Sequence, residues 1–340
     1  MSVRHKRQSD RLAMTGLKTD VRLVKNADKH WGLERNGRVL WLPPEFADLD
    51  LQSTSIQASL LAILRDTLRE YGFLKDAGER APRSLDRNHV FLSALVGEAA
   101  DRCTDFLRAT EFVIVGCGGL GASTAIQLAA LGARRYLLID GDAIEHSNLN
   151  RLLHASVADV GDSKVAVLAR YLADRFGVRS RAIQRVISEE VEWRASRAQS
   201  QFGILTVDDP DAAKLCVRAF ARPTFVPYIH GGYTGARCVM GPLVDTPHAS
   251  CPFCGANQLV AYREARQVTS PSSAMNNQLT AGLLVSQILR WSVGLAVSNT
   301  RHVLDLKTME LTAHPLRIRG CSICANYRNG RPAVRGRKRK

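Results

Sequence analysis

Alternating hydrophobic and polar positions near the beginning of the chain predict three short strands. They lie within residues 20–43 and read VRLVK, HWGLE and RVLWL. Asn36-Gly37 separates the last two and is a strong hairpin signal, because both central positions of a type I′ turn need a positive φ. Apolar residues at helical spacing follow over residues 55–71. This order predicts a small, separate module over residues 20–85.

From Glu111 onward the pattern changes to continuous apolar runs that alternate with helical stretches. FVIVG, RRYLLID and FGILTVDD have the length and composition of buried strands, whereas residues 122–131 and 164–176 have helical periodicity. Strands and helices that alternate at this distance predict an α/β fold with a doubly wound, mainly parallel, Rossmann-like sheet. We expect this larger domain to cover residues 86–327.

A glycine-rich loop over residues 116–121 (GCGGLG) connects the first buried strand to its helix. Glycine lets the backbone approach a phosphate closely, and the free N–H groups of a helix N-terminus bind anionic oxygen. Asp140 ends the next strand, where a carboxylate can accept hydrogen bonds from ribose hydroxyls. The pattern predicts a nucleotide site but is compatible with ATP, NAD or FAD, and such a loop can also be only a tight turn.

Amide and basic side chains follow this acid. Asn148 and Arg151 lie shortly after it, and Lys164 begins the next predicted helix. Clustered positive charge suits a triphosphate, since phosphoryl transfer develops negative charge that must be stabilised. We therefore favour ATP over NAD. The simpler alternatives are that Asn148 or Arg151 caps a helix and that Lys164 is a surface lysine.

Asp208 and Asp209 follow a predicted strand at its carboxyl end. Carboxylate oxygen is the ligand that Mg²⁺ prefers. Of the two, we predict Asp209 to be the magnesium ligand and Asp208 to be its structural neighbour.

Four of the eight cysteines form two CxxC pairs, which are Cys251, Cys254, Cys321 and Cys324. No apolar run is long enough for a membrane span, and the N-terminus lacks the apolar core of a secretory signal, so we expect a cytoplasmic protein. Disulfides are rare in that reducing compartment, and the spacing predicts a structural Zn²⁺ bound by four thiolates. A redox role or incidental spacing is the alternative.

The formal net charge is +15, and much of it lies in residues 1–19 and 328–340. We expect both basic ends to be flexible and solvated. A basic arm can bind nucleic acid or an acidic peptide, or act only as a solubilising tail.

These motifs together resemble the ThiF/MoeB/E1 superfamily over roughly residues 85–325. The resemblance rests on VGCGGLG, LIDGDAIEHSNLNR, GDSK and the strand-end Asp209. Members of this superfamily adenylate a carboxylate with ATP and Mg²⁺. The resemblance implies the following nucleotide-binding residues: Gly116, Gly118, Gly119, Gly121, Asp140, Asp142, Asn148, Arg151 and Lys164. It also implies catalysis by Asp209, Arg151, Lys164 and Arg87, the last reaching across a homodimer.

The chain departs from the usual superfamily pattern at two places, and both favour one branch. Leu152 replaces a common glutamine, and DDP replaces CTDN around Asp209. YIHGGY (228–233) and VMGPL (239–243) resemble the peptide-maturation branch, which includes the enzymes for the microcin C and pantocin A precursors. That branch carries an N-terminal peptide clamp, so residues 20–85 are expected to be a winged-helix-like leader-recognition module.

The resemblance implies a precursor peptide as substrate, and the basic surplus suits an acidic or glutamate-containing one. No cysteine lies between Gly255 and Asn276, where thioester-forming relatives carry one, so direct attack on an acyl adenylate is the simpler mechanism. One alternative is C-terminal adenylation of a ubiquitin-like sulfur carrier. Another is a nucleic-acid-binding protein with a relic Rossmann unit, although nucleic acid is the less favoured partner and no membrane partner is expected.

Overall fold

A computed structural model describes the following parts of the 340-residue chain: residues 21–26, 30–35, 37–42, 64, 67, 68, 87–188, 200–221, 225–234, 236–254, 272–296, 298–316, 321, 323 and 324. The two basic ends, most of the helix expected over 55–71 and most of the polar segment after Gly255 lie outside these residues. The chain divides into two compact units, Met1–Ala100 and Asp101–Lys340.

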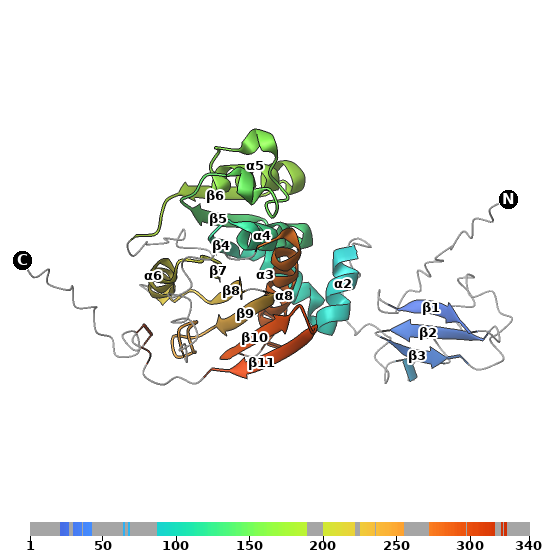
Figure 1. The fold of residues 1–340 in the computed structure, drawn as a ribbon. Helices are drawn as coiled ribbons and strands as arrows, with labels where there is room; N and C mark the ends of the chain where they lie inside the picture. Colours follow the sequence, from blue (N-terminus) through green and yellow to red (C-terminus); the bar gives the residue numbers. More distant parts are fainter. Residues whose placement is uncertain are drawn as a thin grey trace, which may run out of the picture. The chain divides into compact units, whose positions relative to one another are not determined.

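The first unit contains a three-stranded antiparallel sheet, as predicted. Its strands are β1 (Arg22–Lys25), β2 (Trp31–Arg35) and β3 (Arg38–Trp41), in the order β1-β2-β3 (Figure 1). Gly37 has a φ of 76° and donates its N–H to Glu34 Oε1 at 3.1 Å, so the turn has the positive φ that the sequence predicts. Helix α2 (Arg87–Val96) and the short helix η2 (Gly97–Ala99) follow.

The second unit is built on an eight-stranded sheet with the order β11-β10-β9-β8-β7-β4-β5-β6 (Figure 1). Its parallel part consists of β4 (Glu111–Val115), β5 (Arg135–Asp140), β6 (Arg179–Gln184), β7 (Gln201–Leu205) and β8 (Tyr228–Thr234). The antiparallel extension consists of β9 (Arg237–Val244), β10 (Thr300–Asp305) and β11 (Glu310–Pro315). The predicted α/β class and mainly parallel Rossmann-like sheet are confirmed.

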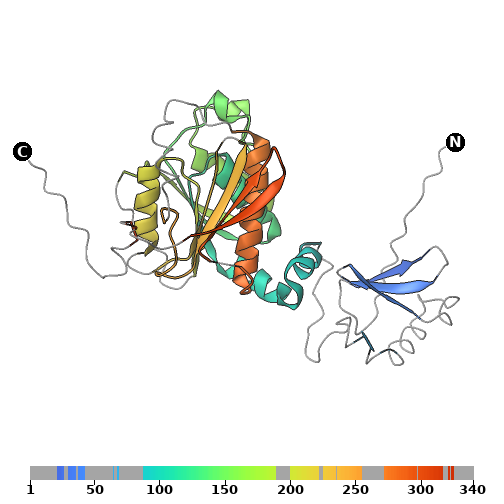
Figure 2. The same cartoon turned by 60° about the horizontal axis from the view of Figure 1, so that its bottom comes forward.

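Helices cover both faces of this sheet. They are α3 (Ala100–Ala109), α4 (Gly119–Leu131), α5 (Lys164–Phe176), α6 (Pro210–Ala221) and α8 (Ala274–Ser292), with the short η3 (His146–Asn148) and η4 (Val157–Asp159). Figure 2 shows α6 on the opposite face from α8, which packs against α4. None of the helices in the described ranges is long and apolar enough to cross a membrane.

Glycines end the two helices that flank the central strands. Gly132 (φ 118°) and Gly177 (φ 63°) are left-handed and terminate α4 and α5. Helix α5 has the predicted bounds, whereas α4 begins at Gly119, three residues before the predicted start. The earlier start places the last glycines of the loop inside the first helical turn, where their N–H groups are free of helical partners.

The core beneath the site is centred on β4, which is buried on both faces. Every residue of β4 is buried, and Phe112 packs with Tyr136 and Phe202 at centroid distances of 5.9 and 6.4 Å. β4 pairs in parallel with β5 on one side and with β7 on the other. Successive strands are added on one side of β4 up to β6 and on its other side from β7 onward, and ligands of open α/β sheets bind at the carboxyl ends of strands at such a switch point.

Candidate active site and metal centre

The glycine loop follows β4 at this switch point, and two of its glycines are required by close packing. Gly116 has a φ of 90°, and a Cβ there would lie 2.9 Å from backbone atoms of Thr206 and Val207. A Cβ on Gly121 would lie 1.9 Å from the carbonyl oxygen of Gly116. Gly118 differs, because nothing lies within 4 Å of its Cβ position. Gly118 therefore borders open space at the N-terminus of α4, where an anion can bind.

Asp140 fixes the loop from the end of β5. Its Oδ2 accepts the N–H of Cys117 at 2.7 Å, and its Oδ1 accepts the N–H of Asp142 at 2.8 Å. Burial raises the pKa of Asp140, while these hydrogen bonds and the nearby Lys164 act in the opposite direction. Each carboxylate oxygen has a second lone pair, so the predicted contact with ribose is compatible with the loop contacts.

Lys164 and Asp142 form an ion pair next to Asp140. The Nζ of Lys164 lies 2.7 Å from Oδ2 of Asp142. The lysine side chain is only 12% exposed and the aspartate is 67% exposed, so the ammonium group is held and the carboxylate can move toward water. A bound phosphate would compete with Asp142 for this ammonium group.

Asn148 and Arg151 lie at the end of η3 and just after it, in the connection between β5 and α5. Asn148 is 5% exposed and forms a capping box in η3, in which its Oδ1 accepts the N–H of Glu145 at 3.4 Å. The Arg151 guanidinium donates to the Ser147 carbonyl at 2.8 Å and to Asn150 Oδ1 at 2.9 Å. Its Cβ lies 3.1 Å from the Cβ position of Gly119, so the arginine adjoins the glycine loop. The capping alternative is observed for Asn148, and nucleotide contact remains a prediction for both.

Asp209 follows β7 and caps α6. Its Oδ1 accepts the N–H groups of Asp211 at 2.7 Å and of Ala212 at 2.9 Å. A capping role was not part of the sequence prediction for this residue. Asp208 and Asp209 are both exposed. The magnesium role of Asp209 therefore stays a prediction, and it would use the carboxylate that also begins α6.

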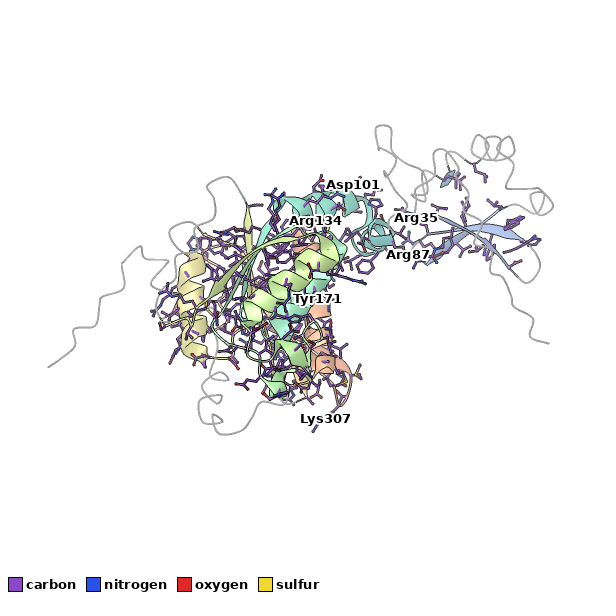
Figure 3. All side chains as sticks on the ribbon, turned by 90° about the horizontal axis from the view of Figure 1, so that it is seen from above. Arg35, Arg87, Asp101, Arg134, Tyr171 and Lys307 are labelled. Atoms are coloured by element: carbon purple, nitrogen blue, oxygen red, sulfur yellow. The ribbon has the colours of Figure 1, made fainter. Side chains whose placement is uncertain are left out.

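Arg87 is the first residue of α2 and belongs to the first unit (Figure 3). Its predicted role across a dimer stays a prediction.

Two residues that the sequence analysis missed also contact the glycine loop. Thr206 Oγ1 donates to the Gly116 carbonyl at 2.7 Å. Asn277 on α8 is fully buried, and its Oδ1 lies 2.9 Å from the Cβ position of Gly119 with no hydrogen-bond partner among the described residues. Its Nδ2 donates to the Ser272 Oγ at 3.0 Å. The serines before α8 are a helix-start signal, but the position of Asn277 beside Gly119 depends on tertiary structure.

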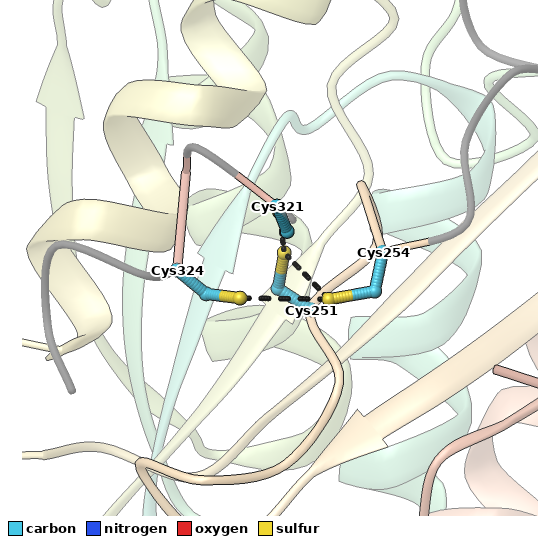
Figure 4. A group of neighbouring side chains, drawn as sticks. All are labelled: Cys251, Cys254, Cys321 and Cys324. Carbon is cyan, nitrogen blue, oxygen red and sulfur yellow. Dashed lines mark hydrogen bonds between the residues drawn. The ribbon is translucent and has the colours of Figure 1, made fainter. Parts of the chain in front are cut away.

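The four predicted metal ligands come together in space (Figure 4). The Sγ–Sγ distances are 3.8 Å for Cys251–Cys254, 3.6 Å for Cys251–Cys321 and 3.5 Å for Cys254–Cys324. Zn–S bonds of about 2.3 Å give a tetrahedron with edges of about 3.8 Å, so the four sulfurs fit Zn²⁺. Contacts with Cys251 and its neighbours lower the pKa of Cys321 and bring that of Cys324 to about 7, which favours thiolate at these two positions, whereas the pKa values of Cys251 and Cys254 are raised.

The cluster would be structural rather than catalytic. Four thiolates complete a tetrahedral shell and leave no open position for a substrate. Cys251, Cys254 and Cys324 are buried in the apolar core, beside Cys216, Val244 and others. A metal here would tie the loop after β9 to the segment after β11.

A glycine loop at the switch point of a mainly parallel sheet places the chain in the class of Rossmann-like α/β proteins. The sequence also matches a known family. The ThiF family model matches residues 88–323, more than half of the sequence, and the chain belongs to this family of adenylating enzymes. The predicted family is confirmed, and with it the expected use of ATP is supported.

Individual relatives are similar over different extents. The adenylyltransferase and sulfurtransferase uba4 of Aspergillus clavatus is 46% identical over 69 residues, which is 20% of this chain and 14% of that relative. The chain thus matches about a seventh of the length of this curated relative.

Solved structures match almost the whole fold. E. coli MccB, in a crystal structure with AMPCPP and MccA, has a TM-score of 0.68 and 20% identity, over 91% of this chain and 98% of MccB. PaaA has a TM-score of 0.67 and 21% identity, over 88% of this chain and 99% of PaaA. At these identities the similarity concerns the fold.

Proposed function

We propose that the chain is an ATP-dependent enzyme that adenylates a carboxylate of a ribosomally made precursor peptide. The glycine loop, Asp140 and Lys164 supply the nucleotide site, and the first unit supplies the peptide site.

The observation that carries this proposal is the extent of the structural match. Residues 101–340 are 240 of 340 residues, or about 71% of the chain, so a match over 91% extends into the first unit. MccB is a microcin C7 biosynthetic enzyme and binds the peptide MccA in its crystal structures. A shared first unit supports a shared kind of substrate.

The small sheet of the first unit has features suited to an extended peptide. In the order β1-β2-β3, β1 and β3 are edge strands, and an added peptide strand gains main-chain hydrogen bonds at such an edge. Val39 and Trp41 on β3 are 39% and 48% exposed. The Trp41 ring covers Gly32, since a Cβ there would lie 2.7 Å from that ring. We propose that β3 presents these apolar side chains to the leader of the precursor.

The proposed chemistry joins a substrate carboxylate oxygen to the α-phosphorus of ATP while the bond to pyrophosphate breaks. The N–H groups at the start of α4 bind phosphate oxygen, and Asp140 binds the ribose. Lys164 exchanges Asp142 for a phosphate, and Arg151 leaves its loop contacts to neutralise charge on the leaving group. Mg²⁺, bound by Asp209, would supply further charge neutralisation.

A second candidate function is activation of a sulfur-carrier protein. The observation that favours it is the local identity to uba4, an adenylyltransferase and sulfurtransferase. That match spans only 69 residues and does not explain the three-stranded unit. The chemistry at the nucleotide would be the same, so the two candidates differ only in the acyl substrate.

Substrate-dependent ATP–pyrophosphate exchange tests both candidates. The full chain is assayed with the peptide encoded by a short open reading frame next to its gene, and with a carrier protein that ends in Gly-Gly. Exchange with the peptide alone supports the proposal. Exchange with the carrier alone replaces the peptide with the carrier as substrate, and exchange with neither refutes both.

A further inference from the structure

A buried arginine on β10 has no counter-charge among the residues that the structure describes. Arg301 is 8% exposed, and its Nη2 donates to the Pro252 carbonyl at 2.7 Å. Its Nε is buried without a partner, and no ion pair to a described carboxylate is present. Burying a cation without a nearby negative charge is strongly destabilising. A negative group is therefore expected beside Arg301.

The contacts of Arg301 point to the thiol cluster. Pro252 lies between Cys251 and Cys254, and the ends of the β10–β11 hairpin hold the residue before this pair. Ser250 donates its N–H to Asn299 Oδ1 and its Oγ to the Leu316 carbonyl at 3.2 Å. These bonds keep the CxxC turn against the strand that carries the arginine.

The other polar neighbour of Arg301 cannot balance its charge. Burial and the charge of Arg301 together lower the pKa of His230 to about 4, so this histidine is neutral at pH 7. Burial also lowers the pKa of Arg301, and Cys251 is the group that opposes this effect. The hydrogen bond from Nη2 to the Pro252 carbonyl places the guanidinium at the Cys251–Cys254 turn, so the thiolates of a metal-loaded cluster would supply the negative charge.

Four thiolates and one Zn²⁺ carry a net charge of −2. We propose that Arg301 is the counter-charge of the metal-loaded cluster and holds the Cys251–Cys254 turn in position for the metal. This inference rests on the proposed zinc site. The relation is reciprocal: the arginine strengthens metal binding, and the loaded cluster offsets the cost of burying the arginine.

Zinc release from the purified full chain to a chromophoric chelator tests this role. Arg301→Met removes the charge and should lower zinc affinity by about 10- to 100-fold, as expected when a group supporting metal ligands is lost. Arg301→Lys keeps the charge and should retain most of the affinity. Arg237→Met is the matched control, because Arg237 is an exposed arginine paired with Asp305 in the same sheet.

A second measurement compares melting temperatures before and after zinc removal. The wild-type chain should lose more stability on zinc removal than Arg301→Met, because only the wild type is left with an unpaired buried cation. Equal zinc release by Arg301→Met and the wild type would overturn the proposal. Equal loss of zinc by Arg301→Lys and Arg301→Met would also overturn it, because packing rather than charge would then be responsible. A wild-type chain without zinc would refute the metal site itself.

Discussion

Asp209 has two roles in the proposed enzyme, and these can be separated by two substitutions. The structure shows that its Oδ1 caps α6 through Asp211 and Ala212. Asparagine is as good an N-cap as aspartate, whereas alanine loses about 1 kcal/mol (range 0.5–2) of stability. Asp209→Asn should therefore melt like the wild type. Asp209→Ala should melt about 2–4 °C lower, the shift expected for about 1 kcal/mol in a domain of this size.

The turnover of these two variants should be equally low although their melting temperatures differ. Both variants lose the charge that attracts Mg²⁺, and we expect both to lose about 100-fold or more in turnover, as for other electrostatic stabilisers of a transition state. ATP affinity should change much less, because the developing charge is present chiefly in the transition state. The assay is substrate-dependent pyrophosphate release, with ATP binding and thermal melting measured on the same samples.

Asp208→Asn is the matched control for Asp209, since it removes an equally exposed carboxylate one position away. We expect a milder effect, because neighbours on an extended segment point in opposite directions. Normal turnover of Asp209→Asn would show that Asp209 is only a helix cap. If Asp208→Asn is inactive at the same time, the magnesium ligand is one residue earlier than predicted.

Four further predictions concern separate parts of the molecule. Gly118→Ala should have the wild-type melting temperature but bind ATP more weakly. Gly121→Ala should melt below the wild type, because its Cβ would lie 1.9 Å from a carbonyl oxygen. Weak ATP binding with a normal melting temperature in both variants would contradict this difference. Metal analysis should find about one zinc per chain, and Cys321→Ser should lower the melting temperature more than ATP affinity; metal-free protein of normal stability would remove the site. Burial lowers the pKa of His154 from its ordinary 6.5 to about 4. Between these two pH values the imidazole is protonated in the unfolded chain but not in the folded one, so the folded state loses stability as the pH decreases. Denaturant unfolding at pH 7 and at pH 5 measures this effect. Between these pH values the free energy of unfolding of His154→Gln should fall by about 2 kcal/mol less than that of the wild type. An equal fall in both proteins would contradict the lowered pKa of His154. Light scattering should show a homodimer. If Arg87 reaches the active site of the partner subunit, mixing inactive Arg87→Ala with inactive Asp209→Asn should restore activity. No recovery would show that Arg87 does not act in the partner's site.

Much of the parallel sheet could be predicted because it depends on local patterns. The apolar run of β4 is buried at every position, and α5 extends from Lys164 to the residue before Gly177, as its periodicity and terminal glycine indicate. The antiparallel extension and α8 were not predicted. Strands β8 and β9 contain glycines, β9 and β11 each contain a proline, and β10 begins with three polar residues, so these strands lack the continuous apolar runs of the parallel sheet.

The candidate site was predictable in composition but not in contacts. Motifs identified Asp140 and Lys164, which the structure brings together with Asp142. Capping by Asn148 was predicted only as an alternative, and the contact between Asn277 and Gly119 was not predicted. Asn277 is far from the loop in sequence and reaches it only through the packing of α8 on α4. Such contacts are set by tertiary structure, which no local spacing reveals.

The thiol cluster has a consequence for the unfolded chain. Its two halves are 70 residues apart, and the chain between them includes α8, which carries Asn277 to the glycine loop. A metal held by all four sulfurs would close this stretch into a ring, and a cross-link around a loop of that size removes about 4 kcal/mol worth of chain entropy from the denatured ensemble. Without the metal, the denatured chain would regain this entropy and the free energy of unfolding would fall accordingly. Zinc would then stabilise the unit that carries the glycine loop, at a distance from the loop itself.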